Sequence, residues 1–155
     1  MFTRVSAWHL VRIGAVMAAV SVGLLVGVGP RSAGAHGDVI PQPVDTAGLN
    51  NVGASWLKEN PYRLKGGEQY KKAIEVGEHG YAANCARCHG LQVISGGIAP
   101  DLRYLDDGAE GDEWFMSRIR GGFSQNGTYK MPPFENVLNQ EAMWAIRSYI
   151  ETREK

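Results

Sequence analysis

The chain has only two cysteines, Cys85 and Cys88, and they stand three residues apart with His89 directly behind them in the stretch CARCHG. Three chemistries use two cysteines at this spacing: a thioredoxin-like redox dithiol, half of a zinc site, and covalent attachment of haem. The other residues of the chain have to distinguish between them.

The composition indicates one globular domain. The chain has 155 residues, of which 44% are hydrophobic and 21% charged. This length suffices for one domain with its own hydrophobic core but is short for two. The 16 basic and 16 acidic residues balance, so the charge suggests neither nucleic acid nor an anionic membrane surface as a partner.

The first 35 residues have the layout of a secretory signal peptide. Arg4 and Arg12 precede an apolar run over residues 13–28, and the small residues Ala33, Gly34 and Ala35 follow. This pattern predicts cleavage after Ala35. The alternative is a retained membrane anchor, since the run is at the lower limit for spanning a bilayer. Both interpretations predict export, and we expect the domain in the periplasm.

Export narrows the chemistry of the motif, because an exported dithiol either forms a redox-active disulfide or serves for attachment. The alternating strands and helices of a thioredoxin-like domain are not found around it. A structural zinc site needs four ligands, and besides His89 only His36 and His79 remain after the predicted cleavage. The pattern C-x-x-C-H favours haem c: both thiols add to the vinyl groups, and the next residue brings its imidazole to the iron from the same side.

An amphipathic helix is predicted from Glu68 into the motif. Its apolar residues recur at spacings of three and four, at Tyr70, Ala73, Ile74 and Gly77. Alanine would be the better helix former at position 77, so the glycine indicates that another part of the chain approaches closely there.

The chain beyond the motif is predicted as loops and two further helices. Residues 90–100 and 121–130 are expected to be loops. Between them, Asp112 is expected to cap a short helix that Gly121 and Gly122 end, and Asn139 is expected to cap the last helix. The prediction is an all-α domain over residues 67–155 with almost no strand signal.

Residues 36–66 are predicted to form an irregular N-terminal extension that lies over the domain. They are rich in Pro, Gly and Asn, and Trp56 and Tyr62 are expected to hold them in place. His36 would be the first residue after cleavage, where a solvated N-terminus is favoured over a copper site.

The second iron ligand has to be sought among the methionines, since no histidine follows the motif. Met143 is on the apolar face of the last helix, where methionine usually fills core, and Met116 is either core or surface. Met131 stands before Pro132 and Pro133, which hold it extended and stiffen the segment. We therefore predict His89 and Met131 as axial ligands; the alternative is a buried Met131 beside an open iron.

Further residues are expected around the haem. The carbonyl of Pro100 is predicted to accept a hydrogen bond from the far ring nitrogen of His89. Leu102 is expected to pack on the haem face. Arg103, Tyr104 and Trp114 are candidates for holding the propionates, although each could be ordinary surface or core.

From Gly66 to Arg153 the chain resembles class I c-type cytochromes. The matching pieces are GEHGY, CARCHG, IAPDL, MPPF and the final AMWAIRSYI. The resemblance implies a monohaem, all-α fold whose first and last helices cross near the haem edge, with Gly77 and Tyr81 at the crossing.

Within that family, ENPYR and the runs GLQVISGGIAPDLRYL and GTYKMPPFENVLNQEAMWAIRSYIE resemble periplasmic cytochromes c that accept electrons from PQQ-dependent alcohol dehydrogenases. This implies an electron carrier that passes electrons to a membrane-bound terminal oxidase or another membrane cytochrome. Such a carrier has no small-molecule substrate. Arg87 and Lys130 would then meet an acidic patch of a partner. Six acidic residues are clustered in the sequence: Asp101, Asp106, Asp107, Glu110, Asp112 and Glu113. They form either a docking face for a second partner or a solvated acidic surface.

Three other functions stay open on the sequence. The same cytochrome could serve another dehydrogenase or a respiratory chain in general. A haem sensor or peroxidase-like enzyme would have an open iron, and a thiol oxidoreductase would have a reactive Cys85.

Overall fold

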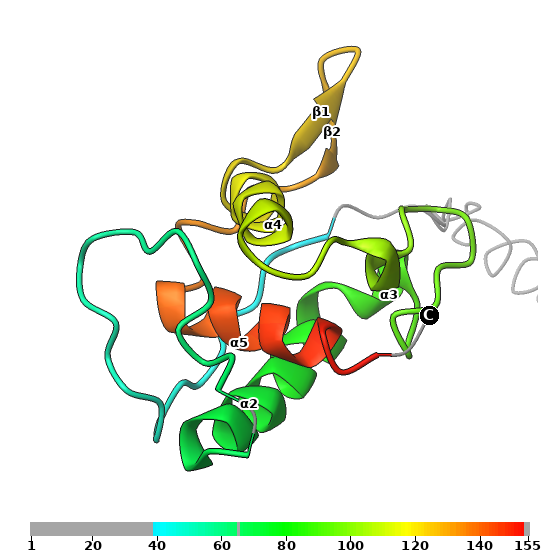
Figure 1. The fold of residues 1–155 in the computed structure, drawn as a ribbon. Helices are drawn as coiled ribbons and strands as arrows, with labels where there is room; N and C mark the ends of the chain where they lie inside the picture. Colours follow the sequence, from blue (N-terminus) through cyan, green and yellow to red (C-terminus); the bar gives the residue numbers. More distant parts are fainter. Residues whose placement is uncertain (1–38, 65, 154–155) are drawn as a thin grey trace, which may run out of the picture. The chain divides into compact units, whose positions relative to one another are not determined.

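The computed structural model describes residues 39–64 and 66–153, and the predicted signal peptide and His36 lie outside them. The elements are α2 (Glu68–Asn84), α3 (Ala86–His89), the 3-10 helix η1 (Leu102–Tyr104), α4 (Ala109–Gly121), β1 (Phe123–Gln125), β2 (Thr128–Met131) and α5 (Gln140–Ile150) (Figure 1). The fold is mainly helical, as predicted, with one small antiparallel hairpin added. No helix within these ranges is long and apolar enough to cross a bilayer.

Helix α4 begins four residues earlier than predicted, and the predicted cap is wrong. Its N-cap is Gly108, so Asp112 lies within the first turns. Asp112 is fully buried and forms ion pairs with Arg63 at 2.6 Å and Arg147 at 3.0 Å. The carboxylate is thus used to pair two guanidinium groups that are distant in sequence. The predicted end is correct, because Gly122 is the C-cap.

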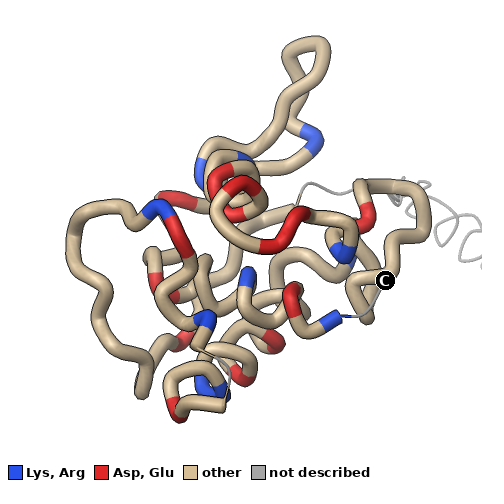
Figure 2. Tube along the Cα trace, viewed as in Figure 1, with Lys and Arg blue, Asp and Glu red and all other residues tan. Residues whose placement is uncertain are grey.

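The predicted loop at 121–130 is wrong, because these residues form the β1–β2 hairpin. Asn126 and Gly127 make its turn with φ of 51° and 74°, the left-handed conformation that Asn-Gly hairpin turns require. The hairpin projects away from α4 (Figure 1), and Figure 2 shows no acidic position along it.

The acidic group predicted near α4 is divided in the structure. Asp112 is buried, and Asp101 forms an ion pair with Arg103 at 2.8 Å. The other four members are exposed: Asp106, Asp107, Glu110 and Glu113. A single acidic docking face of six residues is therefore not present.

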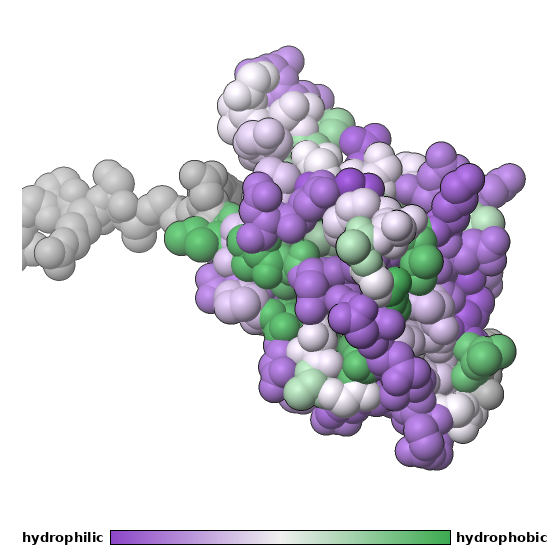
Figure 3. All heavy atoms as spheres, turned by 90° about the vertical axis from the view of Figure 1, so that its left-hand side faces the viewer, coloured by the Kyte–Doolittle hydropathy of each residue, from purple (hydrophilic) through white to green (hydrophobic). Residues whose placement is uncertain are grey.

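The described part of the extension, residues 39–64, has neither helix nor strand, as predicted. Tyr62 is buried and donates a hydrogen bond to the carbonyl of Asn50 at 2.8 Å. Trp56 lies at the surface, with the guanidinium of Arg120 4.0 Å from its ring centre. Figure 3, with the left-hand side of Figure 1 toward the viewer, shows a mostly hydrophilic surface with hydrophobic patches.

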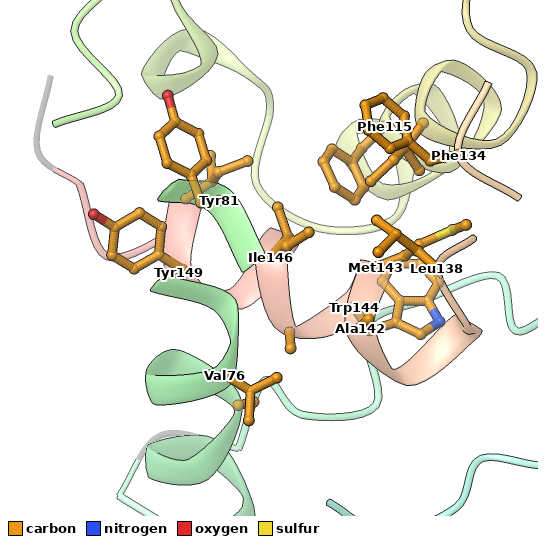
Figure 4. Packing of buried hydrophobic residues seen from close by; sticks show 14 of the residues in the cluster. Val76, Tyr81, Phe115, Phe134, Leu138, Ala142, Met143, Trp144, Ile146 and Tyr149 are labelled. Atoms are coloured by element: carbon orange, nitrogen blue, oxygen red, sulfur yellow. The ribbon is translucent and has the colours of Figure 1, made fainter. Parts of the chain in front are cut away.

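Helices α2 and α5 pack against each other, and Gly77 lies at their contact. A Cβ at this position would stand 2.0 Å from the carbonyl oxygen of Ala145, which explains the glycine that the sequence singled out. Nearby, the rings of Tyr81 and Tyr149 pack with centroids 5.4 Å apart (Figure 4). The crossing implied by the resemblance is confirmed.

The core gathers around α5, in which every residue except Glu141 is buried. Asn139 caps this helix, as predicted, by accepting a hydrogen bond from the backbone N–H of Ala142 at 2.9 Å. Side chains of α4 and of the segment before α5 complete the core, among them Phe115, Phe134 and Leu138 (Figure 4).

Candidate functional site

The two cysteines and the histidine are held on one tight turn directly after α2. The N–H of Cys85 bonds to the carbonyl of Tyr81 at 2.8 Å, which continues the helix into the motif. The carbonyl of Cys85 then accepts from the N–H groups of Cys88 at 3.1 Å and His89 at 2.9 Å. Both thiols are half-buried and unpaired with each other. One helical turn thus presents two sulfurs and one imidazole together.

Gly90 reverses the chain behind the motif. Its φ is 85°, and a Cβ there would stand 1.9 Å from the carbonyl oxygen of Ile94, so both conformation and space demand glycine. The hydroxyl of Tyr81 donates to the carbonyl of Gly90 at 2.8 Å. Helix α2 is therefore fastened to both ends of the motif.

The imidazole of His89 is oriented by Pro100. Nδ1 lies 2.8 Å from the carbonyl oxygen of Pro100, the contact that the sequence predicted. Since a carbonyl oxygen can only accept, Nδ1 carries the proton and the lone pair of Nε2 is available to a metal. Burial is the main influence on His89 and lowers its pKa, although the Pro100 carbonyl and Asp101 oppose it. The neutral ring is the form that binds iron.

Asp101 holds the loop that carries Pro100. Its carboxylate accepts from the N–H of Ser95 at 3.4 Å and from the N–H of Arg103 at 3.1 Å. It also accepts from two nitrogens of the Arg103 guanidinium, at 3.0 and 2.8 Å. The loop is therefore closed on itself by one carboxylate, directly beside the carbonyl that meets His89.

Met131 comes from a separate element, as the last residue of β2. It pairs with Phe123 across the hairpin and packs, half-buried, against the hydrophobic core. Pro132 and Pro133 follow, and the N–H of Phe134 then bonds to the carbonyl of Ile119 at 2.9 Å. The segment is extended, as predicted, and is tied to α4 immediately beyond the two prolines.

The other two candidate methionines belong to the core. Met143 is fully buried in α5, as predicted, and Met116 is buried in α4. Of the three methionines after the motif, only Met131 is partly exposed and lies outside a helix.

The remaining predicted residues lie in two places. Leu102, Arg103 and Tyr104 form η1, in which Leu102 is buried, Arg103 holds Asp101 and Tyr104 is 65% exposed. Trp114 is exposed on α4, where the guanidinium of Arg118 lies 5.5 Å from its ring centre. Leu102–Tyr104 thus follow Pro100 directly, whereas Trp114 belongs to another element.

The structure also bears on the two alternative chemistries of the cysteines. A redox dithiol needs a thiol with a lowered pKa, but burial raises the pKa of Cys85 to about 12. Among residues 39–64 and 66–153, no three His, Cys, Asp or Glu side chains are grouped as metal ligands. The donor set instead fits haem c: two free thiols and an oriented, neutral imidazole on one turn.

Two contacts of this site were missed in the sequence. The resemblance puts Tyr81 at the helix crossing but does not predict its hydrogen bond to Gly90. The sequence groups Asp101 only with the other acidic residues. The sequence carries a local signal for Asp101, since an Asp just before a short helical turn readily caps it. No comparable signal exists for Tyr81, because its acceptor depends on how the chain turns at Gly90.

Comparison with known proteins agrees with this donor set. Residues 72–150 match the domain family described as "Cytochrome C oxidase, cbb3-type, subunit III". The chain belongs to the cytochrome c family: it carries covalently bound haem c and is an electron carrier rather than an enzyme.

Individual proteins are similar to the chain to different extents. Cytochrome c550 of Pseudomonas aeruginosa is 53% identical over 118 residues, which are 76% of this chain and 81% of that protein. Quinohemoprotein alcohol dehydrogenase ADH-IIG of Pseudomonas putida is 35% identical over 81 residues, 52% of this chain but 11% of that protein. The dehydrogenase subunit of the alcohol dehydrogenase (quinone) of Gluconobacter oxydans is 35% identical over 74 residues, 47% of this chain and 9% of that protein. No solved structure matches.

Proposed function

We propose that this protein is a periplasmic acceptor of single electrons from a PQQ-dependent alcohol dehydrogenase, and that it passes them to a membrane-bound terminal oxidase. One observation carries the proposal. A segment similar to this chain makes up about a tenth of proteins named quinohemoprotein alcohol dehydrogenase. These dehydrogenases carry the cytochrome-like segment within their own chain. A related dehydrogenase without such a segment could instead pass its electrons to a separate carrier of the same kind.

Four residues are proposed to hold the haem: Cys85 and Cys88 would form the thioether bonds, and His89 and Met131 would bind the iron. A haem bound there would supply one-electron redox chemistry. A thioether ligand is soft and neutral, so Met131 favours the ferrous state and raises the reduction potential relative to a second histidine. With both residues bound, the iron would have no position left for a substrate, which suits a carrier.

The surrounding residues are proposed to orient these ligands. Pro100 fixes the ring plane of His89 and raises its basicity through Nδ1. Leu102 provides an apolar wall, and Arg103, Tyr104 and Trp114 are proposed to contact the propionates. The bond of Arg103 to Asp101 holds its guanidinium in one place, and part of its charge is already balanced there.

Docking is proposed to use the basic residues on either side of the site. Arg87 lies exposed within the motif, and Lys130 lies exposed beside Met131. Within the described ranges neither side chain forms an ion pair, so both charges can meet an acidic partner. The periplasmic location rests on the predicted signal peptide at residues 1–35.

The test is optical reduction of the oxidised protein by a purified PQQ-dependent alcohol dehydrogenase with its alcohol. Alcohol oxidation to the aldehyde releases two electrons, so we expect two molecules of this protein reduced per alcohol and none without alcohol. No reduction above the rate of an unrelated dehydrogenase would contradict the proposal.

The same optical assay tests the ligands. Met131→Ala should lose the weak far-red band of iron bound to methionine sulfur, while Met116→Ala, a change in the core, should keep it. If the wild-type protein lacks this band and binds carbon monoxide readily, the iron is open and a sensor or enzyme replaces the carrier.

A further inference from the structure

The β1–β2 hairpin is exposed on both faces, so burial of its side chains does not account for its presence. All residues from Phe123 to Lys130 are exposed, and the hairpin projects beyond α4 (Figure 1). A two-stranded hairpin that buries neither face is marginally stable and adds little to a core. Its exposure beside the site therefore points to a role other than packing.

Large aromatic side chains are displayed on this hairpin. Phe123 is 43% exposed and Tyr129 60% exposed. The guanidinium of Arg118 lies 5.1 Å from the ring centre of Phe123 and 5.5 Å from that of Trp114, which fastens the base of the hairpin to α4. Aromatic residues and arginine are the types enriched at the centres of protein interfaces.

All charged residues in the hairpin and the adjoining part of α4 are basic. Residues 114–134 contain Arg118, Arg120 and Lys130 and no acidic residue. Arg120 pairs with Glu135 at 2.9 Å, whereas Lys130 forms no ion pair within the described ranges. The nearest exposed acidic residues flank this stretch: Glu110 and Glu113 precede it, and Glu135, the partner of Arg120, follows it. A partner surface that fits the hairpin is therefore acidic, with an apolar centre for the aromatic rings.

The hairpin is joined directly to the proposed iron ligand. Met131 is the last residue of β2, and its cross-strand neighbour is Phe123. A protein bound to the hairpin thus lies beside the methionine side of the site, where a short distance for electron transfer is useful.

We propose that the hairpin, residues 123–131, is the docking arm that binds an acidic, partly apolar surface of the electron-donating dehydrogenase. The inference rests on the proposed function and specifies which surface of this protein the donor contacts. A membrane surface is the less favoured occupant, because binding to anionic lipid typically uses a cluster of about four to eight Lys or Arg. Residues 114–134 hold only Arg118, Arg120 and Lys130, and Arg120 is already paired with Glu135.

The experiment measures the second-order rate of reduction of the haem-loaded protein by the dehydrogenase, as a function of salt. Lys130→Glu and Tyr129→Ser should each lower this rate about tenfold at low ionic strength. In Lys130→Glu the fall of the rate with added salt should also become shallower.

Matched controls lie at the other end of the molecule in Figure 1, near the start of α2. Lys71→Glu changes an exposed lysine and Leu64→Ser an exposed apolar residue, and both should leave the rate unchanged. The hairpin variants should keep the far-red band and the rate of reduction by ascorbate, which shows that the iron site is intact.

The outcomes separate the two proposals. If the dehydrogenase reduces the wild type but the hairpin variants equal it, the docking arm is refuted while the function stands. If the dehydrogenase does not reduce the wild type, both fall. Loss of binding to anionic lipid vesicles, with unchanged reduction by the dehydrogenase, would assign the hairpin to a membrane instead.

Discussion

Asp101 holds together the loop beside His89. It accepts hydrogen bonds from Ser95 and Arg103, and the side chain of Arg103 is the main reason why its pKa is lowered to about 2. Because Pro100 is its neighbour, the carboxylate helps to keep the carbonyl that faces His89 in place.

The lowered pKa of Asp101 predicts a specific dependence of stability on pH. An unfolded Asp has a pKa of about 3.9, so the folded state gains stability from this ionised group above roughly pH 4 and loses it as the pH falls through about 2. Asp101→Asn should therefore be less stable than the wild type near neutrality, and the two should converge as the pH approaches 2. Urea unfolding at a series of pH values measures this.

The control is Asp107→Asn, because Asp107 is exposed and forms no ion pair within residues 39–64 and 66–153. Its stability should follow the wild type at every pH. A constant difference between Asp101→Asn and the wild type from pH 6 to pH 2 would show that the carboxylate does not act through its charge.

At the scale of elements, the contact of α2 with α5 depends on the absence of a side chain at Gly77. A Cβ there would enter the backbone of α5, 2.0 Å from the carbonyl oxygen of Ala145. Gly77→Ala should force the helices apart and lower the free energy of unfolding by about 1–3 kcal/mol, despite the better helix propensity of alanine. Urea unfolding of the haem-loaded protein gives the value.

Gly121→Ala is the matched control for that substitution. Gly121 is the last residue of α4, and a Cβ there meets nothing within 4 Å. The variant should equal or slightly exceed the wild type in stability. If Gly77→Ala and Gly121→Ala have the same free energy of unfolding, the glycine at position 77 is not required for the close packing of α2 on α5.

The sequence predicted the elements whose signals are local. The apolar periodicity placed α2, and the Asn139 cap placed the start of α5. The start of α4 was wrong because Asp112 is used by Arg63 and Arg147, 49 and 35 residues away, which a capping rule cannot foresee. The hairpin was missed because it buries neither face, so only its Asn-Gly turn marks it.

In the site, too, the residues with local signals could be predicted, and those set by distant contacts could not. Cys85, Cys88 and His89 lie within one turn, so their proximity follows from helix geometry alone. Pro100 could be predicted because the loop back to His89 is short. Met131 was assigned from its prolines, but its place at the end of a strand depends on pairing with Phe123.

At the scale of the whole molecule, the extension is an integral part of the domain. Its backbone lacks a regular hydrogen-bond ladder, and side chains at the start of α5 satisfy it instead. The N–H of Val52 bonds to Glu141 at 3.0 Å and that of Leu57 to Gln140 at 2.6 Å. Irregular chain can be retained only where such partners exist.

Asp112 is the centre at which the extension, α4 and α5 meet. It accepts from the N–H of Asn60 at 2.8 Å, in addition to its ion pairs with Arg63 and Arg147. Asp112 is 0% exposed and Arg147 is 1% exposed. With the carboxylate removed, the buried guanidinium of Arg147 would lose its nearer charge partner and keep only the carboxylate of Glu151, at 3.3 Å.

Asp112→Asn should accordingly lower the free energy of unfolding by about 3–5 kcal/mol. It should also make residues 39–64 more sensitive to proteolysis, since the extension loses its contact at Asn60 and Arg63. Glu135→Gln breaks the pair with Arg120, which is half-exposed on both sides, and should cost at most about 1 kcal/mol. Urea unfolding and limited proteolysis of both variants decide the matter: equal losses, or an extension that stays resistant in Asp112→Asn, would mean that this buried carboxylate does not hold the three elements together.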